Sequence, residues 1–234
     1  MDESVHRKEP PMLRAQFVLF DGFDPLDVVA PFEVLAASGK LAVELVSADG
    51  PGVVRSGVPG LALTATAAFD PDAVGYVLIP GAAGPVDGDP DTGVETIPAL
   101  LSRFASGDAK PLLRRAFDNP DNTVVTICGG SLALAMAGLL EGRTATTHVL
   151  GIDQLSAAGV NAVRARVVDD GDVISGGGVT SGLDVALYVL ERDFGSHAAH
   201  AVEELFEYER RGTAWKAERD GVLQGSTSGV GENE

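Results

Sequence analysis

The chain has 234 residues, of which 45% are hydrophobic and 6% aromatic, enough for one large α/β core or two small ones. Its 34 acidic and 17 basic residues give a net charge of −17 at pH 7. This charge disfavours nucleic acid and anionic membrane surfaces as partners, because both attract basic patches. A single cysteine excludes an intramolecular disulfide and a multi-cysteine zinc site.

The sequence also indicates the compartment and the kind of ligand. No apolar run approaches the length of a membrane-spanning helix, and residues 1–11 lack the apolar core of a signal peptide. A lone cysteine suits a reducing compartment, so we expect a cytoplasmic protein. His and carboxylate residues do not cluster at metal-ligand spacing in the sequence, and we therefore expect no metal and no cofactor.

The first half of the chain alternates apolar strand patterns with helical ones, after a polar leader over residues 1–13 that we expect to be flexible. The expected strands, including a β-ribbon, are 15–20, 41–48, 53–65 and 76–79. The expected helices are 27–37, 92–105 and 111–117. Pro31 is expected near the first turn of its helix, where its missing N–H costs nothing.

The second half continues this alternation. The expected strands are 123–127, 160–168 and 173–175, with a strand-like piece over 142–148. The expected helices are 131–140, 149–158, 183–190 and 198–208. This order favours a single α/β domain over residues 14–209, with a doubly wound, mostly parallel, flavodoxin-like sheet flanked by helices. The polar, Gly- and Ser-rich tail over 210–234 is expected to be mobile.

The only cysteine, Cys128, lies where a buried strand meets a helix. A β-branched run ends at Ile127, and Gly129 and Gly130 supply a sharp turn before the helix. Open α/β sheets bind ligands at this end of their strands, and a helix N-terminus stabilises an anion, so we predict a lowered thiol pKa. The arrangement is similar to a nucleophile elbow. The alternative is that Cys128 is a small buried hydrophobe.

Several other residues are candidates for the same site. The loop over 80–84 follows a buried strand, and its free N–H groups could face a ligand. Asp27 could cap its helix, or it could face the thiol, where burial and like charge would raise its pKa. His148 could activate the thiol, but a structural or pocket-lining role is favoured. Glu33 is expected at the surface or an interface, with pocket lining as the lesser alternative.

Five blocks of the sequence together resemble one known family. They are 17–20 with 26–31, 78–81, 125–131, 143–148 and 175–184. In this order and spacing they resemble the ThiJ/PfpI superfamily, whose members share the class I glutamine amidotransferase-like fold. The match runs from about Gln16 to about Tyr208, and the chain looks most like the isonitrile hydratases within this superfamily.

The resemblance implies that Cys128 is the nucleophile and Asp27 its acidic partner, where the protease-like and deglycase-like branches carry Glu. It implies a homodimer with the active site near the subunit interface and a small-molecule substrate. The reaction would be hydration of an isonitrile to an N-substituted formamide through a covalent thioimidate. Backbone N–H groups of four residues would bind the substrate or the developing charge: Gly81, Ala82, Gly129 and Gly130.

Three departures from the family and two rival functions stay open. One departure is the crossover over 87–122, which is longer than usual in the family. Gly129 stands where the hydratases carry Thr, and Ala82 stands where they carry the second Gly of a Pro-Gly-Gly loop. The first rival is glyoxalase- or deglycase-type action on small carbonyl compounds. Asp27, and the lack of a histidine after Cys128, count against this rival. The second rival is a non-enzymatic redox or ligand sensor built on the same cysteine.

Overall fold

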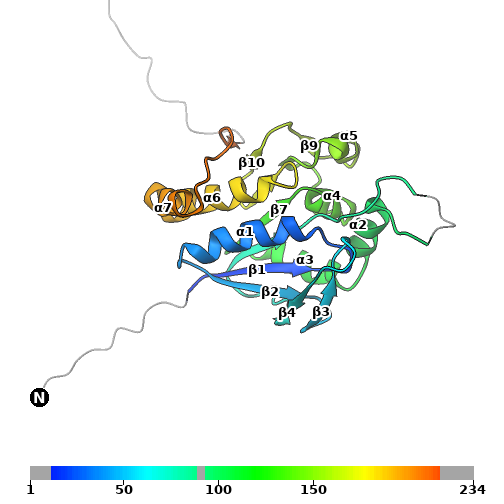
Figure 1. The fold of residues 1–234 in the computed structure, drawn as a ribbon. Coiled ribbons are helices and arrows are strands. Elements are labelled where there is room, and N and C mark those ends of the chain that lie inside the picture. The colour runs from blue at the N-terminus through cyan, green and yellow to red at the C-terminus, as the bar shows by residue number, and fades with distance from the viewer. Residues whose placement is uncertain (1–11, 89–92, 217–234) are drawn as a thin grey trace, which may run out of the picture.

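The computed structural model describes residues 12–88 and 93–216, which form an eight-stranded sheet between two layers of helices (Figure 1). The strand order is β12-β10-β11-β7-β6-β1-β2-β5, and every pair in it is parallel except β10 with β11. The predicted doubly wound, mostly parallel sheet is therefore confirmed. Its strands are β1 Arg14–Leu19, β2 Ala42–Ser47, β5 Ala67–Ala68, β6 Gly75–Ile79, β7 Asn122–Ile127, β10 Val167–Asp169, β11 Val173–Gly176 and β12 Trp215–Lys216.

The helices divide between the two faces of the sheet (Figure 1). One face carries α1 Pro25–Ala37, α6 Ser181–Phe194 and α7 Ser196–Phe206. The other carries α2 Ile97–Ser106, α3 Ala109–Asp118, α4 Gly130–Met136 and α5 Ile152–Ala157. Smaller elements are the predicted ribbon, β3 Gly52–Arg55 with β4 Ala62–Ala65, the pair β8 Thr144–Ala145 with β9 Asn161–Ala162, and the short helix η2 Val149–Gly151.

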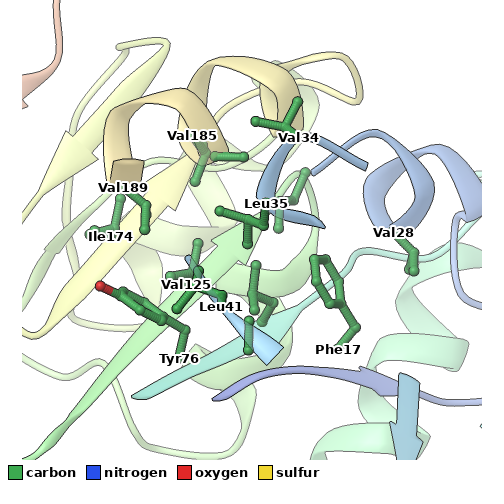
Figure 2. Packing of buried hydrophobic residues seen from close by; sticks show 14 of the residues in the cluster. Phe17, Val28, Val34, Leu35, Leu41, Tyr76, Val125, Ile174, Val185 and Val189 are labelled. Carbon is green, nitrogen blue, oxygen red and sulfur yellow. The ribbon is translucent and has the colours of Figure 1, made fainter. Parts of the chain in front are cut away.

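The central strands are buried on both faces, which is why they read as continuous apolar runs. Because successive side chains in a strand point to opposite faces, Phe17 packs under α1 and α6 while its neighbour Val18 joins the core on the other face. Figure 2 shows the first of these two cores, where Leu35 of α1 and Val185 of α6 lie over Val125 of β7. The site at the strand ends is thus held between two packed layers.

The start of α1 differs from the prediction. The helix begins at Pro25, and Asp24 caps it by accepting a hydrogen bond from Leu26 N–H (3.0 Å). Pro31 therefore lies in the second turn, where it has no N–H to donate to the carbonyl of Asp27. A Cβ atom on Gly182 of α6 would lie 2.8 Å from the Pro31 ring, so the glycine is what lets these two helices approach.

Other helix and strand boundaries also differ from the predicted ones, for local reasons. The helix expected over 131–140 ends at Met136, because Gly138 adopts a left-handed conformation (φ 74°). The strand expected over 160–168 is split into β9 and β10. The helix expected over 92–105 begins at Ile97, with residues 89–92 outside the described part of the chain.

The expected tail is described only as far as Lys216. Within it, β12 pairs with β10, and Arg210 forms ion pairs with Glu203 and Glu191. Residues 217–234, like residues 1–11 of the expected leader, lie outside the described residues, so the predictions of mobility and of the domain limits stay predictions. Among residues 12–88 and 93–216, no helix combines the length and apolar character that crossing a bilayer requires.

Candidate active site

Cys128 lies at a sharp turn between β7 and α4, as the sequence predicted. Its φ of 53° is in the left-handed region, which a non-glycine residue adopts only at a cost of about 1–3 kcal/mol. Two hydrogen bonds hold its backbone in place. Cys128 N–H donates to the carbonyl of Gly176 (3.1 Å), and the Cys128 carbonyl accepts from the Thr147 hydroxyl (2.7 Å). The turn is therefore fixed by β11 on one side and by the β8–η2 connection on the other.

Glycines at the turn let separate segments meet backbone to backbone. A Cβ atom on Gly130 would lie 2.2 Å from the carbonyl oxygen of Ile79, closer than any real contact. A Cβ atom on Gly81 would lie 2.6 Å from Gly129 N and 2.9 Å from a carboxylate oxygen of Asp27. The loop after β6, the cysteine turn and α1 are thus in direct contact, and a side chain at either glycine would separate them.

Asp27 is the third residue of α1, and its side chain is fully buried. Its Oδ2 accepts a hydrogen bond from Gly81 N–H (2.9 Å), whereas its Oδ1 has no hydrogen-bond partner among the described residues. The capping role that the sequence left open for Asp27 belongs instead to Asp24. A buried acceptor without a partner carries a desolvation cost, and such an atom is suited to a bound molecule.

The electrostatics of the site are dominated by burial. Burial raises the pKa of Asp27 well above its ordinary value, and the charge of Asp24 acts in the same direction. Hydrogen bonds with Gly81 N–H and the Cys128 thiol oppose this rise in the Asp27 pKa. Burial also raises the pKa of the Cys128 thiol, and the negative charge of Asp27 adds to it, against a hydrogen bond from Gly129 N–H.

The expectation of a lowered thiol pKa is therefore wrong for this environment. The prediction counted the helix N-terminus, but α4 is short, and loss of water around the sulfur together with the Asp27 carboxyl outweighs it. Two acids in one dry site do not ionise independently, and the second ionisation is strongly opposed. The pair therefore retains a proton at neutral pH, and this proton is available to a molecule bound against Oδ1.

The four residues predicted to bind developing charge are together at the turn, but their N–H groups differ in use. The N–H of Gly81 is taken by Asp27, whereas that of Gly129 acts on the thiol and lowers its pKa. Ala82 is buried and forms a β-bridge with Phe23. A Cβ atom on Gly129 would lie 3.2 Å from the flexible tip of Leu101 and 3.4 Å from the Cα atom of Gly81, so this position is less tightly enclosed than Gly81 or Gly130.

The other two candidates have separate positions. His148 is half-buried and uses Nδ1 to accept from Leu150 N–H (3.2 Å), so it caps η2, in line with the structural alternative. Glu33 is exposed on α1, whereas Asp27, six residues earlier, is buried on a different side of the helix. This chain therefore does not bring Glu33 to its own thiol. Thr147, which holds the Cys128 carbonyl, was missed, although it lies inside a block that carried the family resemblance.

Comparison of the chain with known proteins agrees with these features of the site. Residues 103–192 match the DJ-1/PfpI family. Over 199 residues the chain is 34% identical to an isonitrile hydratase from Pseudomonas putida, covering 84% of this chain and 78% of that protein. A deglycase from Thermococcus kodakarensis is 27% identical over 66% of this chain and 84% of its own length. The chain belongs to the DJ-1/PfpI family, which confirms the predicted resemblance.

A solved structure shows the same relationship in three dimensions. The crystal structure of a ThiJ/PfpI family protein from Pseudomonas syringae superposes with a TM-score of 0.69 at 25% sequence identity. The superposition covers 91% of this chain and 83% of that one. The family therefore fixes the fold, while the activities named among the relatives differ, and the site residues have to be argued from this chain.

Gly130→Ala tests whether the turn depends on backbone contact. The new methyl group has no space beside the Ile79 carbonyl, so we expect the free energy of unfolding in urea to fall by at least about 1–3 kcal/mol. Gly52→Ala is the matched control, because a Cβ atom there meets nothing within 4 Å. Equal stability losses for the two variants would contradict this account of the turn.

Asp27→Asn tests the raised pKa. Because the unfolded chain releases this proton at lower pH than the folded one, the Asp27 carboxyl makes stability fall as pH rises above the ordinary Asp value. One proton gives a slope of at most about 1.4 kcal/mol per pH unit, and Asp27→Asn should remove it. Urea unfolding at pH 4, 5, 6 and 7 measures this, with the exposed Glu33→Gln on the same helix as control. Parallel pH curves for wild type and Asp27→Asn would sink the prediction.

Proposed function

We propose that this protein is an isonitrile hydratase, which adds water to the terminal carbon of an isonitrile and releases an N-substituted formamide. The observation that carries the proposal is the buried Asp27 carboxyl against the Cys128 thiol, with Oδ1 free to contact a bound molecule. The sequence similarity to the isonitrile hydratase from Pseudomonas putida, over 84% of this chain, supports the same function. Asp27 and Cys128 are the catalytic residues of this proposal.

The first step joins sulfur to carbon. Cys128 Sγ attacks the terminal carbon of the isonitrile, and the thiol proton passes by way of the Asp27 carboxyl to that same carbon. The product is a thioimidate, in which sulfur, hydrogen and a C=N bond share the carbon atom. Because both pKa values are raised, the proton stays at the pair until the substrate arrives to accept it.

The second step releases the formamide. A water molecule gives one proton to Asp27 and adds its oxygen to the thioimidate carbon, and Asp27 passes that proton to the nitrogen. The C–S bond then breaks, the hydroxyl proton passes to Asp27 as the carbonyl forms, and Asp27 returns this proton to the sulfur. Gly129 N–H, which points to the sulfur, stabilises negative charge there, and Gly81 N–H keeps Asp27 in position. The net change is one isonitrile plus one water to one formamide.

We also propose that the protein acts as a homodimer with the site near the subunit interface. Exposed apolar side chains support this: Leu26 and Val29 lie on α1 beside the buried Asp27, and Val149 and Leu150 directly follow His148. A second copy that covers these side chains would also close the site against water.

Val29→Arg tests the dimer. A charge on this face of α1 would have to be buried in the interface, so we expect the sedimentation mass to fall to that of one chain. Leu205→Arg is the control, because Leu205 is equally apolar and 69% exposed but lies on α7. If Val29→Arg dimerises with the same affinity as wild type, the interface lies elsewhere.

The turnover of cyclohexyl isonitrile tests the reaction and both roles. We expect wild type to form the formamide, Cys128→Ala to form none, and Asp27→Asn to lose about 10²–10⁴-fold in kcat, as for a general acid–base residue. Glu33→Gln, which removes an exposed carboxylate from the same helix, should keep wild-type activity. Formamide formation is followed by mass spectrometry, and circular dichroism shows that each variant is folded.

The rival functions predict different results in the same assay. Wild type that leaves the isonitrile intact but consumes methylglyoxal would favour glyoxalase- or deglycase-type action. Wild type that turns over neither compound, while peroxide converts Cys128 to a sulfinate stoichiometrically, would favour a sensor. Either result would overturn the hydratase proposal.

A further inference from the structure

A cavity of about 320 Å³ opens beside the cysteine turn. Its walls come from the segment between β8 and η2, the starts of η2 and α5, the segment between β9 and β10, and the glycine-rich turn after β11. The lining residues are Thr146, Thr147, Val149, Ile152, Arg164, Ala165, Arg166, Gly177 and Gly178. This volume is enough for a small organic molecule.

Two of these walls are the segments that hold the cysteine. Thr147 donates its hydroxyl proton to the Cys128 carbonyl (2.7 Å). Gly177 follows directly on Gly176, whose carbonyl accepts from Cys128 N–H (3.1 Å). The cavity therefore borders both segments that fix the cysteine turn, which makes it a candidate for the part of a substrate that does not react.

The charge of the cavity is unusual for this chain. Its lining includes two arginines and no carboxylate, in a protein of net charge −17. Arg166 is neutralised, because its Nε donates to the buried carboxylate of Asp184 (2.6 Å). Arg164 is exposed, and it has neither a hydrogen-bond nor an ion-pair partner among the residues that the structure describes. The cavity therefore carries one uncompensated positive charge.

The remaining lining groups do not neutralise the charge of Arg164. The hydroxyls of Thr146 and Thr147 both donate to backbone carbonyls, of Ala165 and Cys128. Val149 and Ile152 supply an apolar part of the wall. The cavity thus offers the Arg164 guanidinium and an apolar surface. Together they could bind a carboxylate joined to a short apolar spacer.

We propose that the substrate is an isonitrile that also carries a carboxylate, and that Arg164 is the residue that selects it. The inference rests on the proposed hydration and extends it to a substrate class. The isonitrile carbon meets Cys128 while the carboxylate lies against the Arg164 guanidinium, so Arg164 binds the substrate without taking part in the chemical steps. A loss of Arg164 should therefore change KM and leave kcat intact.

The experiment compares isocyanoacetate with its methyl ester, which lacks the charge and carries one more methyl group, using wild type and Arg164→Gln. We expect the substitution to raise KM for isocyanoacetate about tenfold or more, as for a lost charge-assisted hydrogen bond, with kcat unchanged. For the neutral ester we expect a change within about twofold. Arg164→Lys, which keeps the charge but loses the fork, should fall between wild type and Arg164→Gln.

Arg55→Gln is the matched control. Its guanidinium also has no partner among the described residues, but it lies on β3 and outside the cavity, so neither substrate should be affected. Salt should raise KM for isocyanoacetate in wild type and not in Arg164→Gln. Equal changes for both substrates in Arg164→Gln, or no change for either, would overturn the assignment.

Failure of the proposed function is distinguishable from failure of this inference. If wild type hydrates neither compound, the hydratase proposal fails, and the anion site is tested by calorimetric binding of N-formylglycinate, the product expected from isocyanoacetate. Binding to wild type that Arg164→Gln weakens about tenfold supports the site without any turnover. Absent binding, or equal binding to both proteins, overturns it.

Discussion

The contact on which this site depends is the meeting of Gly81, Gly129 and Asp27, residues that lie on three separate segments. Gly81 N–H donates to Asp27 Oδ2, and no side chain fits between Gly81 and the cysteine turn. Because this contact excludes water, the carboxyl and the thiol are desolvated together, and both pKa values rise. The acid–thiol pair is therefore a consequence of backbone packing as much as of residue type.

The same arrangement is locally unfavourable and has to be held by the rest of the fold. Cys128 adopts a left-handed conformation, and Asp27 buries a carboxylate oxygen without a partner. Both features oppose folding and persist only where the surroundings determine them. Here the surroundings are two packed helical layers and the hydrogen bonds of Gly176 and Thr147 to the turn. Strain and desolvation are thus concentrated at the point where chemistry is proposed, as expected for a reactive site.

Membership of the DJ-1/PfpI family narrows the function without fixing it. In this chain the fold places Cys128 at the end of a central strand, and its relatives include both a hydratase and a deglycase. What separates such activities is the small set of side chains around the sulfur. Around the sulfur this chain has a buried aspartate and a glycine directly after the cysteine, and an arginine without a partner among the described residues lines the cavity beside the turn. We therefore base the substrate on these residues rather than on the fold.

The sequence by itself determined the sheet, the position of the cysteine turn and the family. Each of these depends on local patterns, such as the apolar run ending at Ile127 and the glycines that follow, which extend over a few residues. The tertiary structure decided that the thiol pKa is raised, and that Asp24 caps α1 while Asp27 faces the thiol. It also decided that Arg164 has no partner among the described residues. Burial and charge pairing are set by residues far away in the sequence, as with Gly81 and Cys128, which lie 54 and 101 positions after Asp27. No local pattern contains that information.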